Sequence, residues 1–189
     1  MRVGLGIDQA MGKTGVAIIQ ENLELVDVAC ISLARSGDAR LYELAERLTA
    51  FAAYPIFWVA MEGLSLGSVN RLGLLGEVSG AVKLWSQSRL GLLPLVVAPS
   101  QLKLFATGKG QASKAQVVRY AVSNHGAALE QLVPETAKAW KEAKGQADPV
   151  GHDMADAITL AEIAVLAGTS QRPRTRAQAE VLKKLKADK

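Results

Sequence analysis

Four carboxylates stand where predicted strands end or where a predicted helix begins. Asp8 ends the first apolar run of the chain, Glu62 ends a later one, and Asp153 and Asp156 open the last long apolar stretch. Carboxylates beside apolar segments are costly to bury unless positive charge meets them. Mg²⁺ and Mn²⁺ are hard cations that bind oxygen, and two such ions can activate water and stabilise a leaving oxygen in phosphodiester hydrolysis. The four acids therefore predict a metal-dependent nuclease.

Each acid also has an interpretation that involves no metal. Asp8 could begin an Asx-turn, and Glu62 could be a solvated strand end. Aspartate is favoured in the first turn of any helix, which would explain Asp153 and Asp156 by capping and by the helix dipole. Because these two lie three residues apart on one helix face, however, their charges repel unless a cation bridges them. Together, the four acids favour the metal-ligand interpretation.

Positive charge is concentrated in two segments. Residues 100–120 contain four Lys or Arg side chains, Lys103 and Lys114 among them, and no acid. From residue 171 to the end there are seven Lys or Arg residues against two acids, although the formal net charge of the whole chain is only +4. Basic segments near an acidic centre suit a polyanion held beside metal ions. A solvated, frayed tail is the alternative for the second segment.

Length and composition favour a single domain with a packed core, since the chain has 189 residues and a hydrophobic fraction of 49%. No apolar run reaches the roughly 18 residues that a membrane span needs, and the N-terminus shows no signal-peptide pattern. The single cysteine, and the absence of a Cys/His cluster with zinc-ligand spacing, favour a cytoplasmic protein. We expect residues 1–168 to form the domain and residues 169–189 a basic tail that is either a charged helix or disordered.

Hydrophobic periodicity predicts an α/β fold with a mixed five-stranded sheet flanked by helices, in the order β-β-β-α-β-α-β-α-α. The first three strands would form a meander, while the first, fourth and fifth would run parallel through helical crossovers. Asp8 and Glu62 would then share the carboxyl edge of the sheet, where ligands bind in open α/β folds. The predicted strands are 3–8, 16–20, 25–33, 56–61 and 94–98, and the predicted helices are 38–53, 68–88, 113–124 and 153–167, with 134–144 as a further short helix.

Several fragments resemble the RuvC family of Holliday junction resolvases, which have the RNase H-like nuclease fold. The similarity spans roughly residues 1–125 and 147–168 and follows the order of the family's motifs. The fragments are Gly6-Ile7-Asp8 with Thr14-Gly15, Met61-Glu62, Ala98-Pro99-Ser100-Gln101-Leu102-Lys103, Gly110-Gln111-Ala112-Ser113-Lys114-Ala115-Gln116-Val117 and His152-Asp153-Met154-Ala155-Asp156-Ala157.

The resemblance implies a homodimer that cuts four-way DNA junctions by paired phosphodiester hydrolysis, with two Mg²⁺ or Mn²⁺ ions in each active site. Lys103 and Lys114 match lysines that contact DNA. His152 stands beside the last acidic pair, where it could support the ligands or carry a proton. The implied catalytic and metal-binding residues are Asp8, Glu62, Asp153 and Asp156.

The chain departs from the family after Glu62. The family often has an aromatic residue there that helps to open the junction, whereas residues 64–67 read Leu-Ser-Leu-Gly. We therefore expect junction opening to differ or to use another residue.

Three other functions stay open. The fragment Gly6-Ile7-Asp8 with Thr14-Gly15 also resembles the first phosphate motif of actin-like ATPases and sugar kinases, which need two such domains. A nuclease with this fold could instead act on other branched DNA or on structured RNA. A junction-binding protein that does not cut is the third, although the presence of all four acids argues against it.

The predicted helix 68–88 offers a surface for dimerisation. Gly73, Gly76 and Gly80 line one side of it, and each lowers helix propensity by about 1 kcal/mol. Close approach of another element would compensate for this, and that element is either the sheet or a partner subunit. Leu72, Leu75 and Trp85 would supply apolar contact area.

Overall fold

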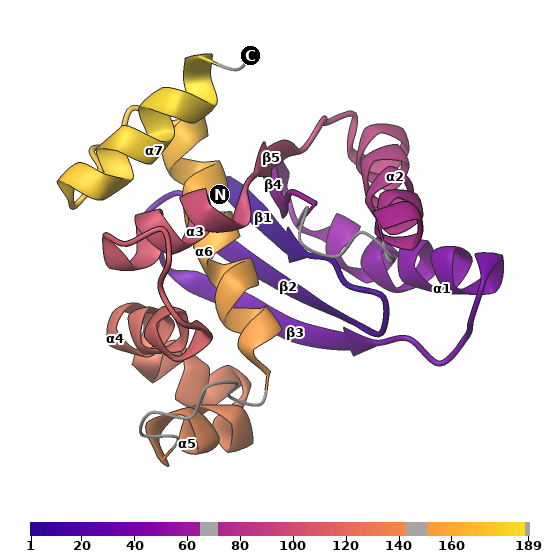
Figure 1. Cartoon of the computed structure of the whole chain (residues 1–189), viewed down its shortest axis with the longest axis horizontal. Helices are drawn as coiled ribbons and strands as arrows, with labels where there is room; N and C mark the ends of the chain where they lie inside the picture. Colours follow the sequence, from indigo (N-terminus) through magenta and orange to yellow (C-terminus); the bar gives the residue numbers. More distant parts are fainter. Residues whose placement is uncertain (65–71, 143–150, 188–189) are drawn as a thin grey trace.

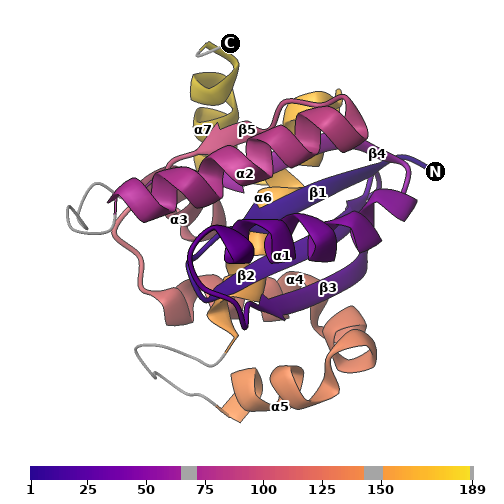
Figure 2. The same cartoon turned by 90° about the vertical axis from the view of Figure 1, so that its right-hand side faces the viewer.

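Five strands form one mixed sheet that is covered by helices on both faces (Figure 1, Figure 2). The computed structural model describes residues 1–64, 72–142 and 151–187. The strand order is β3-β2-β1-β4-β5, in which the first three strands of the chain are antiparallel neighbours and β4 and β5 run parallel to β1. The predicted fold class is confirmed. The strands are β1 Val3–Asp8, β2 Lys13–Gln20, β3 Leu25–Ser32, β4 Ile56–Glu62 and β5 Leu95–Val97.

Helices α1 and α2 cover one face of the sheet, and α3, α4, α6 and α7 lie on the other, with α5 beside α4 (Figure 1). No helix in the described part of the chain is long and apolar enough to cross a membrane. The helices are α1 Asp38–Thr49, which continues into the 3-10 turn Ala50–Ala53, α2 Leu72–Leu90, α3 Pro99–Thr107, α4 Lys114–Leu132, α5 Pro134–Glu142, α6 His152–Gly168 and α7 Arg176–Ala187.

Alternation along β1 separates the two halves of the core. Val3, Leu5 and Ile7 are fully buried on the side of α1 and α2. Gly4 and Gly6 face α6 instead, and a Cβ at Gly6 would come within 2.0 Å of the carbonyl oxygen of Ala157. Because glycine has no Cβ, α6 can lie directly on the sheet, and it is buried along nearly its whole length.

Helix α3 was missing from the predicted elements. Pro99 stands in its first turn, where the missing N–H of proline needs no partner. The side chain of Gln101 accepts a hydrogen bond from the Ala98 N–H at 2.9 Å, and Leu102 and Phe105 bury the inner face. This short helix holds Lys103 in place.

Helix α4 begins directly after its N-cap residue Ser113, and it is longer than predicted and is kinked at His125. His125 is buried, and its Nε2 lies 2.8 Å from Oε1 of Glu162 on α6. Tyr120 also donates a hydrogen bond to Glu162. This buried network holds the second half of α4, beyond the predicted helix end at residue 124, against α6.

The basic C-terminal segment contains α7, which packs against α3 and α6. Val181, Leu182 and Leu185 are 0%, 6% and 2% exposed, and Nε2 of Gln178 donates to the Tyr120 hydroxyl at 3.1 Å. Of the two predicted alternatives, a charged helix and disorder, the helix is observed for residues 176–187. The division of the chain at Gly168 stays a prediction.

Candidate active site

Parallel pairing of β1 and β4 brings two of the four acids together. Ile7 lies beside Met61, and the next residue of each strand is Asp8 and Glu62, so both acids stand at the same edge of the sheet. Their carboxyl groups lie close enough for each to shift the pKa of the other. The predicted meeting of Asp8 and Glu62 at the carboxyl edge is confirmed.

Gly15 brings the other two acids to the same place. It pairs with Asp8 across β1 and β2, and a Cβ at Gly15 would lie 2.0 Å from the carbonyl oxygen of Asp153. The first turn of α6 therefore rests on the backbone of β2 beside the end of β1. As a result, Asp153 and Asp156 line one pocket of about 410 Å³ together with Asp8 and Glu62.

Burial and mutual repulsion favour the protonated form of these acids. Burial is the main reason that the pKa of Asp8 lies well above its usual range, and Glu62, Asp156 and Asp153 add to the rise. Burial likewise raises the pKa of Asp156 to about 7 and raises that of Glu62. Three carboxyl groups with raised pKa values in one pocket are typical of a functional site.

Three basic side chains line the same pocket: Lys103 from α3, Lys114 from α4 and His152 from the start of α6. Nζ of Lys114 lies 2.7 Å from Nε2 of His152, and this ring nitrogen lies 2.9 Å from Oδ1 of Asp153. Both lysines act to lower the pKa of Glu62. The two lysines predicted from the sequence therefore face the acids, and Nε2 of His152 lies within reach of both Lys114 and Asp153 but can bond only one of them at a time.

The pocket offers the carboxylate oxygens that a hard divalent cation binds, but these side chains do not converge on a single metal position. No three Asp, Glu, His or Cys side chains in the described parts of the chain lie close enough together to hold a metal ion as they stand. Burial and the neighbouring acids raise the pKa of Asp8, which favours a proton on this carboxyl group. A cation could replace that proton as counter-charge, because metal ligands must be deprotonated.

A further polar residue of the pocket, Gln9, was not among the predicted site residues. Gln9 follows Asp8, is 6% exposed, and donates from Nε2 to the main-chain oxygen of Glu62 at 2.6 Å. Its Oε1 is buried and has no hydrogen-bond partner among the described residues. An unpartnered oxygen beside four acids fits a site that a cation or a bound water completes. The only sequence signal was a polar residue directly after the acid that ends β1.

Sequence comparison finds no matching family profile and no matching curated relative. The three-dimensional structure does match solved structures. It superposes on Thermus thermophilus RuvC in complex with a Holliday junction substrate with a TM-score of 0.64 and 20% sequence identity, covering 84% of this chain and 90% of that chain. A second T. thermophilus RuvC structure gives a TM-score of 0.61 and 21% identity over the same shares.

The chain has the RuvC fold.

The RuvC fold agrees with the resemblance that the sequence fragments indicated, and the departure after Glu62 can now be placed. Leu64 is 39% exposed and lines the pocket with Leu75 of α2. Residues 65–67, the rest of the segment in which the RuvC family often has its aromatic side chain, lie outside the described residues, as do residues 68–71 of the predicted helix.

Proposed function

We propose that the protein is a metal-dependent endonuclease that resolves four-way DNA junctions by paired phosphodiester hydrolysis. The observation that carries the proposal is the pocket at the edge of β1 and β4, where four acids, two lysines and a histidine meet. The fold supports it, because a T. thermophilus RuvC with the same fold forms a complex with a Holliday junction substrate.

The four acids would hold two Mg²⁺ or Mn²⁺ ions, which when bound supply the charge that activates water and stabilises a leaving oxygen. The protein contributes the positions of the carboxylates. The β1–β4 pairing orients Asp8 and Glu62, and the glycine contact under α6 orients Asp153 and Asp156. Asp8 and Asp156 must lose their protons when the site is filled, because protons and cations compete for the same oxygen atoms.

Lys103 and Lys114 would hold the DNA backbone at the pocket. A lysine is a mobile point charge that binds phosphate without reading bases, so these contacts would recognise the shape and charge of the junction. A hydrogen bond from Lys114 to the unprotonated Nε2 of His152 would keep the lysine beside the acids while the phosphate is bound.

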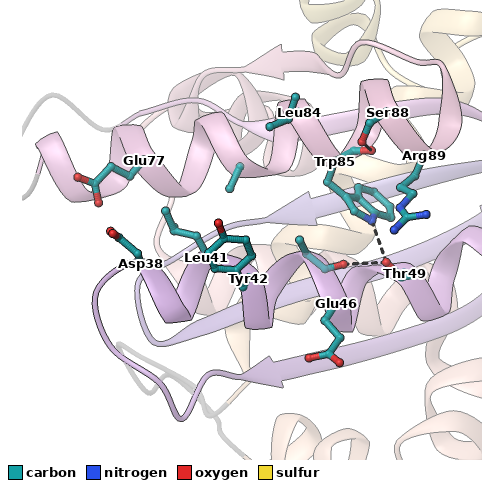
Figure 3. Close-up of a pocket in the computed structure, with 12 residues that line it drawn as sticks. Asp38, Leu41, Tyr42, Glu46, Thr49, Glu77, Leu84, Trp85, Ser88 and Arg89 are labelled. Atoms are coloured by element: carbon teal, nitrogen blue, oxygen red, sulfur yellow. Dashed lines mark hydrogen bonds between the residues drawn. The ribbon is translucent and has the colours of Figure 1, made fainter.

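Two symmetric cuts require two active sites, and a closed two-fold homodimer is the simplest arrangement. We place its interface on the groove of about 910 Å³ between α1 and α2 (Figure 3). Tyr42 and Leu84 on this groove are 75% and 71% exposed, a large apolar exposure for a monomer. No described atom lies within 4 Å of a Cβ built at Gly76 or Gly80, so packing on the sheet does not account for these glycines.

The expectation that Trp85 supplies apolar area to the dimer interface is wrong. Trp85 is 4% exposed, and its Nε1 donates to Oγ1 of Thr49 at 3.3 Å (Figure 3). Trp85 belongs to the buried apolar cluster on the face of the sheet that α1 and α2 cover. The exposed neighbour Leu84 offers the apolar area instead.

The other functions are less well supported. An actin-like ATPase or a sugar kinase needs two domains that close on a nucleotide, whereas the described residues contain one sheet. A junction-binding protein without cleavage would retain several buried acids of raised pKa for no chemical use. A nuclease that acts on other branched DNA or on structured RNA is the second candidate. The family often has an aromatic residue shortly after the glutamate that ends β4, where it helps to open the junction. This chain has Leu64 there, so its substrate can differ.

The deciding experiment incubates the protein with a labelled four-way junction, a matched duplex and a structured RNA in Mg²⁺, Mn²⁺ or EDTA. We expect paired cuts in the junction with either metal and none in EDTA. Asp8→Asn should bind the junction without cutting it, while Glu142→Gln, an exposed change on α5, should cut normally. Preferential cutting of the RNA would favour the second candidate, and cutting in EDTA would contradict metal dependence.

A further inference from the structure

Gln9 holds the end of β4 against the end of β1. Its side chain reaches from the residue after Asp8 to the main-chain oxygen of Glu62, with Nε2 as the donor at 2.6 Å. A carbonyl oxygen can only accept hydrogen bonds, so the NH₂ group must face Glu62 and Oε1 must face away from it. The orientation of the amide is therefore determined by its partner.

Oε1 of Gln9 accepts no hydrogen bond from the described residues. Gln9 is 94% buried, since its exposed fraction is 6%, and Oε1 has no donor among the described residues. A buried polar atom without a partner costs about 1–3 kcal/mol. The residue nevertheless lines the pocket that contains all four acids.

The four acids that share the pocket with Gln9 limit the kinds of group that its Oε1 can bind. A carboxylate that binds a cation is ionised, so in the filled site it accepts hydrogen bonds and cannot donate one to an amide oxygen. A neutral amide oxygen is, however, a ligand that hard divalent cations and their bound waters use. It also adds a ligand without adding negative charge to a pocket in which the acids already repel one another.

We propose that Gln9 is a fifth oxygen donor of the cation site, which binds a divalent ion through Oε1 directly or through one water molecule. The inference rests on the proposed metal-dependent function and deepens it. The two ends of the amide then have separate tasks: Nε2 positions the main chain of Glu62, and Oε1 meets the ion or its water.

Two substitutions separate these tasks. Gln9→Met keeps the length of the side chain but removes both the donor and the oxygen, whereas Gln9→Glu keeps an oxygen and loses the NH₂ donor. Gln171→Met is the matched control, because Nε2 of Gln171 also donates to a main-chain oxygen, that of Glu21, and Gln171 does not line the pocket. Binding of Mn²⁺ to the full-length protein without DNA is measured by electron paramagnetic resonance, and thermal unfolding is followed with and without Mn²⁺.

We expect Gln9→Met to weaken Mn²⁺ binding about tenfold or more and to gain less thermal stability from Mn²⁺ than the wild type. Gln9→Glu should bind Mn²⁺ at least as tightly as the wild type, and Gln171→Met should be unchanged. If Gln9→Glu does not fold, Gln9→Asn takes its place and should bind Mn²⁺ more tightly than Gln9→Met.

The inference is overturned if Gln9→Met binds Mn²⁺ like the wild type, or if the oxygen-retaining variant is as weak as Gln9→Met, since Gln9 would then only position Glu62. In both cases junction cleavage by the wild type would leave the proposed function intact. A wild-type protein that neither binds Mn²⁺ nor cleaves DNA would remove both proposals together.

Discussion

Gly15 and Asp153 are in backbone contact: a Cβ on Gly15 would stand 2.0 Å from the Asp153 carbonyl oxygen. This contact joins β2 to the first turn of α6 and so sets where Asp153 and Asp156 lie relative to Asp8. The position of half of the acid cluster therefore depends on the absence of one methyl group.

Gly15→Ala should displace the start of α6 and strongly reduce cleavage. Forcing an extra methyl into a packed contact costs about 1–3 kcal/mol, so the protein should still fold but with a lower melting temperature. Gly12→Ala is the control, because Gly12 lies in the turn before β2 and none of the described atoms stands within 4 Å of a Cβ built there. Equal cleavage rates for the two variants would show that the contact does not position the acids.

Without metal ions, the protein should lose stability as the pH rises from about 4 to about 7. Folding raises the pKa of Asp156 from 3.8 to about 7, and the pKa values of Asp8 and Glu62 shift in the same direction. A raised carboxyl pKa stabilises the folded state below the unfolded pKa, and this contribution is lost as the pH passes the folded pKa.

Melting temperatures in EDTA at pH 5 and pH 8 check this prediction, with the higher value expected at pH 5. Asp156→Asn should reduce the difference, and saturating Mg²⁺ should restore stability at pH 8 because the ion replaces the protons. A metal-free protein that is more stable at pH 8 would contradict the shifts.

Lys103→Ala and Lys114→Ala should each weaken junction binding and flatten its salt dependence by about one unit of slope, as expected for one lost phosphate contact. Lys138→Ala, an exposed change on α5, is the control. Binding isotherms at several salt concentrations measure the slope. An unchanged slope in both variants would mean that these lysines do not meet phosphate.

Charge and packing of the C-terminal helix can be separated. Deleting residues 171–189 should lower the melting temperature, because burial of each of Val181, Leu182 and Leu185 is worth up to about 1.5–3 kcal/mol. Replacing the exposed Arg176, Lys183 and Lys186 by alanine should preserve stability and weaken binding to every DNA shape alike. A selective loss of junction preference in this triple variant would instead make α7 part of shape recognition.

Gly76→Arg should break the dimer and convert paired cuts into single nicks. No described atom lies within 4 Å of a Cβ at this site, so the variant should fold, and the arginine would obstruct a partner that packs on α2. Gly126→Arg on α4, where the space is also open, is the matched control. Light scattering measures the mass of the protein bound to the junction, and wild-type protein with the mass of one chain would contradict the dimer.

Local sequence patterns determined the sheet, most of its helices and the place of Asp8 and Glu62. Apolar runs with turn signals between them specify strands, and parallel strands end at one edge, so an acid at the end of each run could be assigned to that edge. Helix α3 was not predicted because it is short and its first turn contains Pro99, a residue type that more often marks a turn or the end of a helix.

Tertiary packing decided the rest of the site. Gln9 reaches Glu62 only because β1 and β4 are neighbours, and its unpartnered oxygen can be recognised only once the surroundings are known. Likewise, the basic C-terminal segment could have been a free tail until α7 was seen to share a core with α6. Periodicity reports which face of an element is apolar, whereas the partner of that face depends on contacts between residues far apart in the chain, which no local pattern contains.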